Sequence, residues 1–314
     1  MVNWIRPRKP NYTAGRVVII SDDMRFTEYK YWYPLISKEV YLYNQFRARK
    51  CPLNLSVNPG FLGLKESPSG TKVMNAEQLQ ELANNGVEML SHGSHHVYLN
   101  YVNVSQPLSP NDTRIYYDFY SSGFYPGLEY LIVEGEKQET FTITNVSDYA
   151  STGYIDISPP LTNSYTTNAK LSPTADTITS ELQGAIDILN NLGIECKYHV
   201  NAIYANNDIA QPILENLFEA VVTRSTTPPF PYIEDINLYD IRRTKDISNY
   251  TYEDIDNYLT EVREKDTIMF VQGHGGTNKT TLSNLRYLIQ KAYEMGVRII
   301  SFNEAIEYIK EVQQ

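Results

Sequence analysis

Cysteine and histidine are both scarce in this sequence of 314 residues. The two cysteines, Cys51 and Cys196, lie far apart and lack the close spacing of a cysteine metal site. We expect two buried free thiols, with a single disulfide as the alternative. Only five histidines are present, and three of them fall within five positions of the segment EMLSHGSHH, residues 88–96. This crowding of a rare residue raises the question of a metal site.

Long apolar runs and clustered positive charge are also lacking. No segment is apolar over the length needed to span a bilayer, and the first residues, MVNWIRPRKPNYT, lack the apolar core of a signal peptide. The net charge is −10, and the basic stretch RPRK at 6–9 is short. We therefore expect no membrane insertion and no nucleic-acid partner. The protein either stays where it is made or leaves by a route that this chain does not encode.

Tyrosine is abundant, with 26 residues against 10 phenylalanines. A tyrosine ring has an apolar face and a polar tip, which suits stacking on sugar rings and also suits wet seams between domains. Hydrophobic residues make up 42% of the chain and charged residues 20%, which indicates a folded globular protein. Both interpretations of the tyrosines remain open at this point.

The first hundred residues alternate short apolar runs with amphipathic segments. Strands are predicted at 16–21 (RVVIIS), 52–60 (PLNLSVNPG) and 87–90 (VEML), and helices at 28–46 and 75–86. Polar residues gather where the strands end. This pattern predicts a parallel sheet or barrel, whose functional sites lie at the carboxyl ends of the strands.

Between 102 and 173 the pattern changes to alternating apolar and polar residues, without intervening helices. We interpret 102–173 as an inserted β-rich module, and 1–101 with 174–314 as one barrel of six or seven βα units. The module could bind glycan or an assembly partner, as in a phage tail or another particle that acts outside the cell. Alternatively, it is a surface addition that lengthens a substrate groove.

Ionisable residues follow three of the predicted strands. His92 and His96 are four positions apart and can hold one ion, with Asp23 as a third ligand and a position left open for water. Imidazole with carboxylate suits Zn²⁺, with Co, Ni or Mn as alternatives. Asp22 could accept a proton from water, and His274 could protonate a departing amine. Base, metal and acid together describe amide hydrolysis.

Three motifs carry a resemblance to a known family. VVIISDDM at 17–24, LQELANNGVEMLSHGSHH at 79–96 and IMFVQGHGG at 268–276 resemble successive motifs of the polysaccharide deacetylase family, the NodB-homology carbohydrate esterases. The match covers roughly 15–100 and 175–310. The resemblance implies a distorted (β/α)7 barrel and a divalent metal that serves removal of N-acetyl or O-acetyl groups from glycans.

The resemblance also implies roles for individual residues. Asp22 resembles the general base and His274 the general acid, while Asp23, His92 and His96 resemble the metal ligands. The acetylated glycan would be a sugar of peptidoglycan, a chitin-like polymer or another surface polysaccharide.

Other positions are candidates for contact with substrate. The family carries an arginine in its middle barrel motif, but KYHVNAIYANND has none, so Arg242 or Arg243 is the candidate to orient Asp22 or to meet substrate. His95 lies inside the histidine motif at a position that is not a ligand. Tyr198 and His199 complete the candidate substrate contacts, with strand packing as the alternative role for His199.

Two further functions compete with an active deacetylase. The chain could be a glycan-binding or structural protein, of the phage-tail kind, that keeps the barrel with weak or no turnover. It could also be a metal-dependent amidase that acts on a non-sugar amide, since the same chemistry serves any carbonyl that fits.

Overall fold

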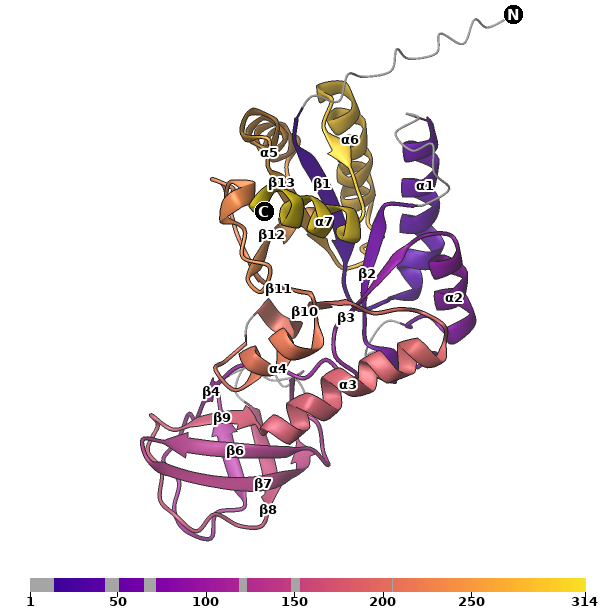
Figure 1. Cartoon of the computed structure of the whole chain (residues 1–314). Coiled ribbons are helices and arrows are strands. Elements are labelled where there is room, and N and C mark those ends of the chain that lie inside the picture. Colours follow the sequence, from indigo (N-terminus) through magenta and orange to yellow (C-terminus); the bar gives the residue numbers. More distant parts are fainter. Residues whose placement is uncertain (1–13, 43–50, 65–71, 119–122, 148–152, 205) are drawn as a thin grey trace, which may run out of the picture.

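The computed structural model describes residues 14–42, 51–64, 72–118, 123–147, 153–204 and 206–314. These residues form two sheets, one of parallel strands surrounded by helices and one of antiparallel strands. Figure 1 shows the antiparallel sheet beyond α3 and α4, away from the chain termini.

The parallel sheet closes into a barrel. Its order is β13-β12-β11-β10-β3-β2-β1, and β13 also pairs with β1, so seven strands form a complete ring. The ring strands are β1 (Arg16–Ser21), β2 (Leu53–Val57), β3 (Glu88–Ser91), β10 (Tyr198–Val200), β11 (Ala220–Ser225), β12 (Ile241–Asp246) and β13 (Ile268–Gly273). This topology confirms the predicted distorted (β/α)7 barrel. An eighth strand, β14 (Arg298–Ile299), pairs only with the start of β1.

Helices cover the outside of the barrel and close one end of it. They are α1 (Tyr33–Leu42), α2 (Ala76–Asn84), α3 (Ala175–Asn191), α4 (Ala210–Leu217), α5 (Tyr252–Lys265), α6 (Lys279–Met295) and α7 (Phe302–Gln313). Short helical turns lie at η1 (Glu28–Trp32), η2 (Pro59–Phe61), η4 (Ala202–Tyr204), η5 (Ile233–Asp235) and η6 (Ile247–Asn249). Apolar side chains of α7 pack against inward-facing residues near the strand starts, so this helix closes the end opposite the carboxyl ends of the strands.

The alternation of side chains along β1 explains where its polar end points. Val18 and Ile20 pack in the barrel interior, whereas Val17 and Ile19 pack against the outer helices. All four are fully buried, and burial of each such side chain contributes roughly 1.5–3 kcal/mol. Because successive side chains of a strand alternate between its two faces, Asp22 comes at the next inward position, at the mouth of the barrel.

The antiparallel sheet is a small β module. Its order is β4-β9-β6-β7-β8-β5, and a bridge between Val104 and Tyr117 brings its first and last strands together, so the sheet curls around its own core. The strands are β4 (Val102–Asn103), β5 (Arg114–Tyr117), β6 (Glu129–Glu134), β7 (Lys137–Val146), β8 (Gly153–Ser158) and β9 (Lys170–Pro173). All six lie between 102 and 173, within the segment expected to be inserted.

Several predicted elements differ in the structure. Strand β12 was not predicted, and neither were β4 and β9. The sequence pattern predicts a helix that begins after Thr177, whereas α3 begins at Ala175, because Thr174 caps it by accepting a hydrogen bond from the Thr177 amide. Residues 43–46 of the predicted first helix, and the basic stretch at 6–9, lie outside the described residues.

The two cysteines and the helices bear on two other expectations. Cys51 and Cys196 are buried free thiols, which excludes the disulfide alternative. Burial raises the pKa of the Cys196 thiol to about 12. None of the helices in the described ranges combines the length and apolar character needed to cross a membrane.

Candidate active site

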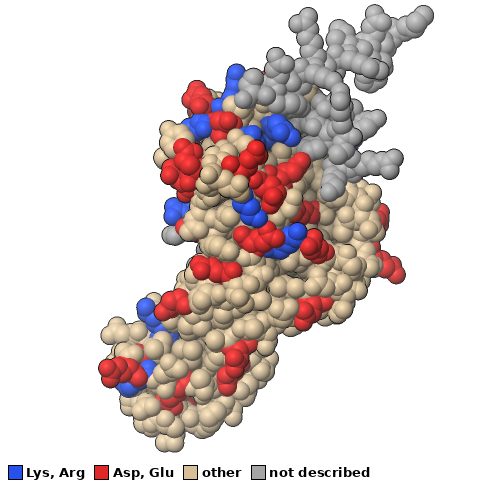
Figure 2. Space-filling view, viewed as in Figure 1, with Lys and Arg blue, Asp and Glu red and all other residues tan. Residues whose placement is uncertain are grey.

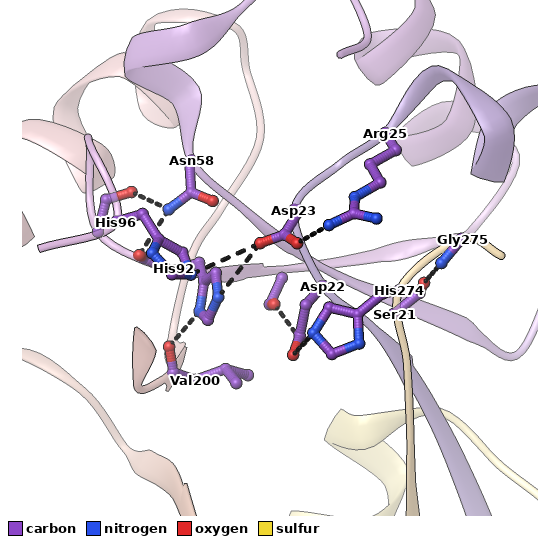
Figure 3. A network of polar contacts seen from close by, with 12 residues as sticks. Ser21, Asp22, Asp23, Arg25, Asn58, His92, His96, Val200, His274 and Gly275 are labelled. Carbon is purple, nitrogen blue, oxygen red and sulfur yellow. Dashed lines mark hydrogen bonds and ion pairs between the residues drawn. The ribbon is translucent and has the colours of Figure 1, made fainter. Parts of the chain in front are cut away.

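Polar side chains from separate strands meet at the mouth of the barrel (Figure 3). Asp22 and Asp23 follow β1, His92 follows β3, Asp246 ends β12 and His274 follows β13. Since the carboxyl ends of the strands in a βα barrel open on one face, residues distant in sequence become neighbours there.

Asp23, His92 and His96 form a cluster suited to a metal ion. Their donor atoms lie within 4.8 Å of one another, with Asp23 Oδ1 3.7 Å from Nε2 of each histidine. A tetrahedral site with bonds of about 2 Å places its donors roughly 3.3 Å apart, so the spacing fits one ion. Asp23 Oδ1 is buried and has no hydrogen-bond partner among the described residues, which is costly unless a cation binds there.

The surroundings of the cluster prepare these donors. His92 Nδ1 lies 2.6 Å from the Val200 carbonyl, which fixes the proton on Nδ1 and leaves the Nε2 lone pair facing Asp23. Burial lowers the pKa of His92 to about 4, so its ring is neutral at physiological pH, as a ligand must be. Burial alone would raise the pKa of Asp23, but the nearby His96, His92, His274 and Arg25 hold it well below its ordinary value.

The backbone around the cluster is strained. Asp23, Met24 and His96 have positive φ angles of 76°, 40° and 62°, a region that non-glycine residues seldom adopt. Such strain costs on the order of 1–3 kcal/mol per residue and gathers at functional sites. Two of the three strained residues are in the metal cluster.

Asp22 lies beside the cluster as a buried, ionised carboxylate. It accepts a hydrogen bond of 2.6 Å from Ser56 Oγ, and Arg243 Nη1 lies 2.7 Å from Oδ1 and 2.6 Å from Oδ2. Burial raises the pKa of Asp22, but the charges of Arg243, His92 and His274 outweigh burial and lower it. Asp22 is therefore available to accept a proton at neutral pH.

His274 forms the other side of the site. Its Nδ1 lies 2.6 Å from Asp246 Oδ2, and its Nε2 lies 3.7 Å from Asp22 Oδ2. Burial lowers the pKa of His274, but the hydrogen bond to Asp246 and the charges of Asp22 and Asp23 raise it above its ordinary value overall. The ring is 36% exposed, so a proton on Nε2 faces both the site and solvent.

Hydrogen bonds between loops fix the site. Asn58 donates through its amide to the carbonyls of His92 (2.6 Å) and Gly93 (3.1 Å), which ties the end of β2 to the histidine loop. On the other side, the Gly275 amide donates to Ser21 Oγ, and Ser21 Oγ donates to the buried Glu28. Burial raises the pKa of Glu28 well above its ordinary value.

The structure brings together the five residues predicted to carry the chemistry, and it pairs Asp22 with one of the two predicted arginines, Arg243. Arg242 does not take part, because it faces outward and binds Asp240 at 3.2 Å. Arg243 is itself 2% exposed and engaged with Asp22, which is the placement expected of a residue that orients this carboxylate.

The placement of Tyr198 and His199 corrects the expectation that they contact substrate. Tyr198 points into the barrel interior and donates to Asn303 at 2.7 Å. His199 is 1% exposed, and its ring stacks on Phe218 with a centroid distance of 5.0 Å. Tyr198 thus packs inside the barrel and His199 packs against Phe218, in the opposite directions expected of neighbouring residues in a strand. His95, in contrast, lies half-exposed beside the metal cluster.

Three residues of the site were not predicted. Asp246 ends a strand that the sequence pattern did not indicate, Ser56 lies inside β2, and Arg25 donates to Asp23 Oδ2 at 2.8 Å. An acidic residue closing the IRRTKD segment could have indicated Asp246 had that segment been recognised as a strand.

No family model matches the chain, and no curated protein matches it. Among the solved structures similar to it are CE4 family proteins. One is a mutant of BA3943, a CE4 family pseudoenzyme from Bacillus anthracis, and this mutant has restored enzymatic activity. Its sequence is 10% identical to this chain, and the TM-score is 0.49. The match covers 94% of this chain and 69% of the BA3943 chain.

Two other similar structures are a domain of a xylanase and a carbohydrate esterase. The Xyl-CE4 domain of a multidomain xylanase from the hindgut metagenome of Trinervitermes trinervoides is 11% identical, with a TM-score of 0.46 and coverage of 94% and 91%. The family 4 carbohydrate esterase from Streptomyces lividans in complex with acetate is 8% identical, with a TM-score of 0.45 and coverage of 91% and 93%. At these identities the likeness concerns the fold, and function is argued from the site.

Proposed function

We propose that this protein is a metal-dependent hydrolase that removes acetyl groups from a glycan. The observation that carries the proposal is the arrangement at the barrel mouth. There, an ionised carboxylate and an imidazole paired with a second carboxylate lie next to an Asp–His–His cluster with an unpartnered donor oxygen. This set of residues is suited to hydrolysis of an amide or ester.

Asp23, His92 and His96 would hold the ion. Two imidazoles and a carboxylate suit Zn²⁺, with Co, Ni or Mn as alternatives, and three protein ligands are typical of catalytic sites with an open position. When bound, the ion lowers the pKa of a water molecule and polarises a carbonyl oxygen. Arg25 holds the second oxygen of Asp23 and so fixes which oxygen faces the histidines.

The residues around the cluster supply the proton transfers. Asp22, held by Ser56 and Arg243, accepts a proton from the attacking water. His274 donates its Nε2 proton to the departing nitrogen or oxygen, and Asp246 holds the ring in the tautomer and orientation that this step needs. The 3.7 Å between His274 Nε2 and Asp22 Oδ2 supports an acid and a base that act on one reacting group.

The substrate we propose is an acetylated glycan, as the motif resemblance implies, with an N-acetyl sugar of peptidoglycan or a chitin-like polymer first. The net charge of −10 does not favour a polyanionic substrate, which agrees with a neutral polymer. On the face shown in Figure 2, basic side chains stand singly or beside acidic ones and form no continuous basic patch.

The test measures metal content and acetate release together. We expect about one divalent ion per chain, acetate release from N-acetylated chitooligosaccharides or peptidoglycan, and loss of that release when a chelator removes the metal. Metal binding without acetate release from any acetylated glycan would contradict the hydrolase and identify a glycan-binding protein on the same barrel. Release from simple amides alone would identify a non-sugar amidase.

The Asp246–His274 pair gives the activity a predictable pH dependence. His274 must be protonated to act as the acid, so activity falls as the pH rises through its pKa. Replacing Asp246 with asparagine removes a charge that raises that pKa. We therefore expect the alkaline limb of kcat/KM to move to lower pH in Asp246→Asn.

The control for this prediction is Asp240→Asn, a carboxylate of the exposed Arg242 pair, which should keep the wild-type profile. An unchanged alkaline limb in Asp246→Asn would remove His274 from the proton transfer.

A further inference from the structure

Three aromatic rings from three separate segments meet beside the metal cluster. Phe61 ends the turn after β2, His95 directly precedes the ligand His96, and Tyr125 belongs to the β module. The ring centroids are 5.6 Å apart for Phe61 and His95, 6.0 Å for His95 and Tyr125, and 6.2 Å for Phe61 and Tyr125. We call these three residues the aromatic corner.

His95 is held rigidly in this corner by a buried carboxylate. Glu181 of α3, 5% exposed, accepts hydrogen bonds from the His95 amide (2.9 Å) and binds its Nδ1 (2.8 Å). The Glu181 carbonyl also accepts from the Ser94 amide and hydroxyl. Gly60 leaves room for the ring, since a Cβ there would lie 2.8 Å from His95 Nε2. A charged side chain is thus buried in order to orient a histidine that is not in the metal cluster.

Tight backbone packing fixes the third ring of the corner. Gly123 of the module docks on the loop after the histidines, where a Cβ would lie 2.5 Å from the Tyr98 Cβ. The Gly123 carbonyl accepts from the Tyr98 amide and from the Tyr130 hydroxyl. Phe124 points into the module core, and the next residue, Tyr125, points to the barrel.

The aromatic corner is not closed like a core. The His95 side chain is 45% exposed, and Phe61 and Tyr125 are partly exposed. It therefore leaves part of the surface of each of the three side chains open to solvent, next in sequence to His96 of the Asp–His–His cluster. Sugar rings have the matching character, with apolar C–H faces and hydroxyl rims, and aromatic side chains that are apolar on the face and polar at the tip suit them.

We propose that the aromatic corner binds a sugar ring adjacent to the one whose acetyl group lies at the metal, so that the inserted module, through Tyr125, helps determine which glycan is accepted. This inference rests on the proposed function, because it extends the substrate of that site from one sugar to a chain. The module would then contribute to substrate specificity. His95 would contact the substrate, whereas its neighbour His96 would bind the metal.

The test measures binding of N-acetylglucosamine tetramer to the full chain by calorimetry, in an Asp22→Asn background so that the sugar stays intact. Adding Tyr125→Ala is expected to raise Kd about tenfold, the loss of one well-packed stacking contact. Tyr125→Phe should restore binding to within roughly twofold, because it keeps the ring. The matched control is Tyr116→Ala, an exposed tyrosine on β5 of the same module, which should leave Kd unchanged.

A kinetic arm separates this role from a structural one. In the otherwise wild-type chain, Tyr125→Ala should raise KM for the tetramer with little change in kcat, so that the ratio of kcat/KM for the tetramer to that for 4-nitrophenyl acetate falls about tenfold. A fall of equal size for both substrates, with a lowered Tm, would overturn the proposal in favour of a packing role.

The two proposals fail in different ways. The sugar subsite is overturned if adding Tyr125→Ala to Asp22→Asn leaves Kd unchanged, or if neither Asp22→Asn nor the double variant binds the tetramer. This holds whether or not the wild type releases acetate. A Kd that rises as expected, while the chain with Asp22 intact releases no acetate, supports the subsite and contradicts the hydrolase.

Discussion

Replacing Asp22 with asparagine is expected to reduce acetate release by at least about 100-fold while the metal content stays near wild type. General-base catalysis typically contributes 10²–10⁴-fold, and an amide cannot take the proton. The metal should remain, because Asp22 is not among the three clustered donors. Ser56 can still donate to the asparagine oxygen, so the local geometry is largely kept. Acetate release and metal content on the same preparation check this result.

The substitution also has a cost in stability that the experiment must separate from catalysis. Arg243 is 2% exposed and would lose its counter-charge, and breaking a buried pair from one side is destabilising by about 3–5 kcal/mol. Thermal unfolding of the variant distinguishes a folded, inactive protein from an unfolded one. Asp256→Asn, a carboxylate of α5 outside the barrel mouth, serves as control. Wild-type release by folded Asp22→Asn would remove this residue from the mechanism.

Replacing His92 with alanine is expected to empty the metal site and abolish acetate release. Loss of even an outer partner of a ligand typically costs 10–100-fold in metal affinity, so loss of one of three protein ligands should cost more than about 100-fold. The expected result is a substoichiometric metal content after dialysis and no chelator-sensitive activity. Metal analysis together with acetate release measures both.

His199→Ala is the matched control for this variant. His199 is equally buried but packs against Phe218 and is not among the three clustered donors, so its loss should lower the unfolding temperature and leave one metal per chain. Full metal content and activity in His92→Ala would show that the Asp–His–His cluster does not bind the ion.

Much of the barrel could be predicted because several of its strands have a recognisable sequence pattern. The run RVVIIS is buried on both faces, and a strand of that kind reads as continuous β-branched residues. Its end, followed by two aspartates, placed Asp22 and Asp23 at the mouth without any knowledge of their partners. The histidine motif and the strand before His274 were recognisable for the same reason.

Strand β12 could not be predicted in this way, and the reason is functional. Its sequence IRRTKD lacks an apolar run, because the inward position that would hold an apolar side chain holds Arg243, the partner of Asp22. Its last residue, Asp246, serves His274. A strand that supplies two polar groups to the site loses the hydrophobic pattern by which strands are recognised. Arg242 and Arg243 are adjacent, so the choice between them depends on the strand. Because side chains alternate along β12 and Ile241 points inward, Arg243 points inward too.

The aromatic corner was also beyond sequence pattern. Tyr125 is one tyrosine among 26, and nothing near it in the sequence distinguishes it. Its place beside His95 depends on how the module docks, which is a tertiary contact between segments that no periodicity records.

The chain enters the β module a few residues after His92 and His96 and returns from it through α3, where Glu181 accepts hydrogen bonds from Ser94 and His95. The loop that carries these two histidines therefore continues into the module at one end, and its flank is hydrogen-bonded to the barrel helix by which the chain leaves the module. We therefore expect a change in the position of the module to be transmitted through this loop to His92 and His96.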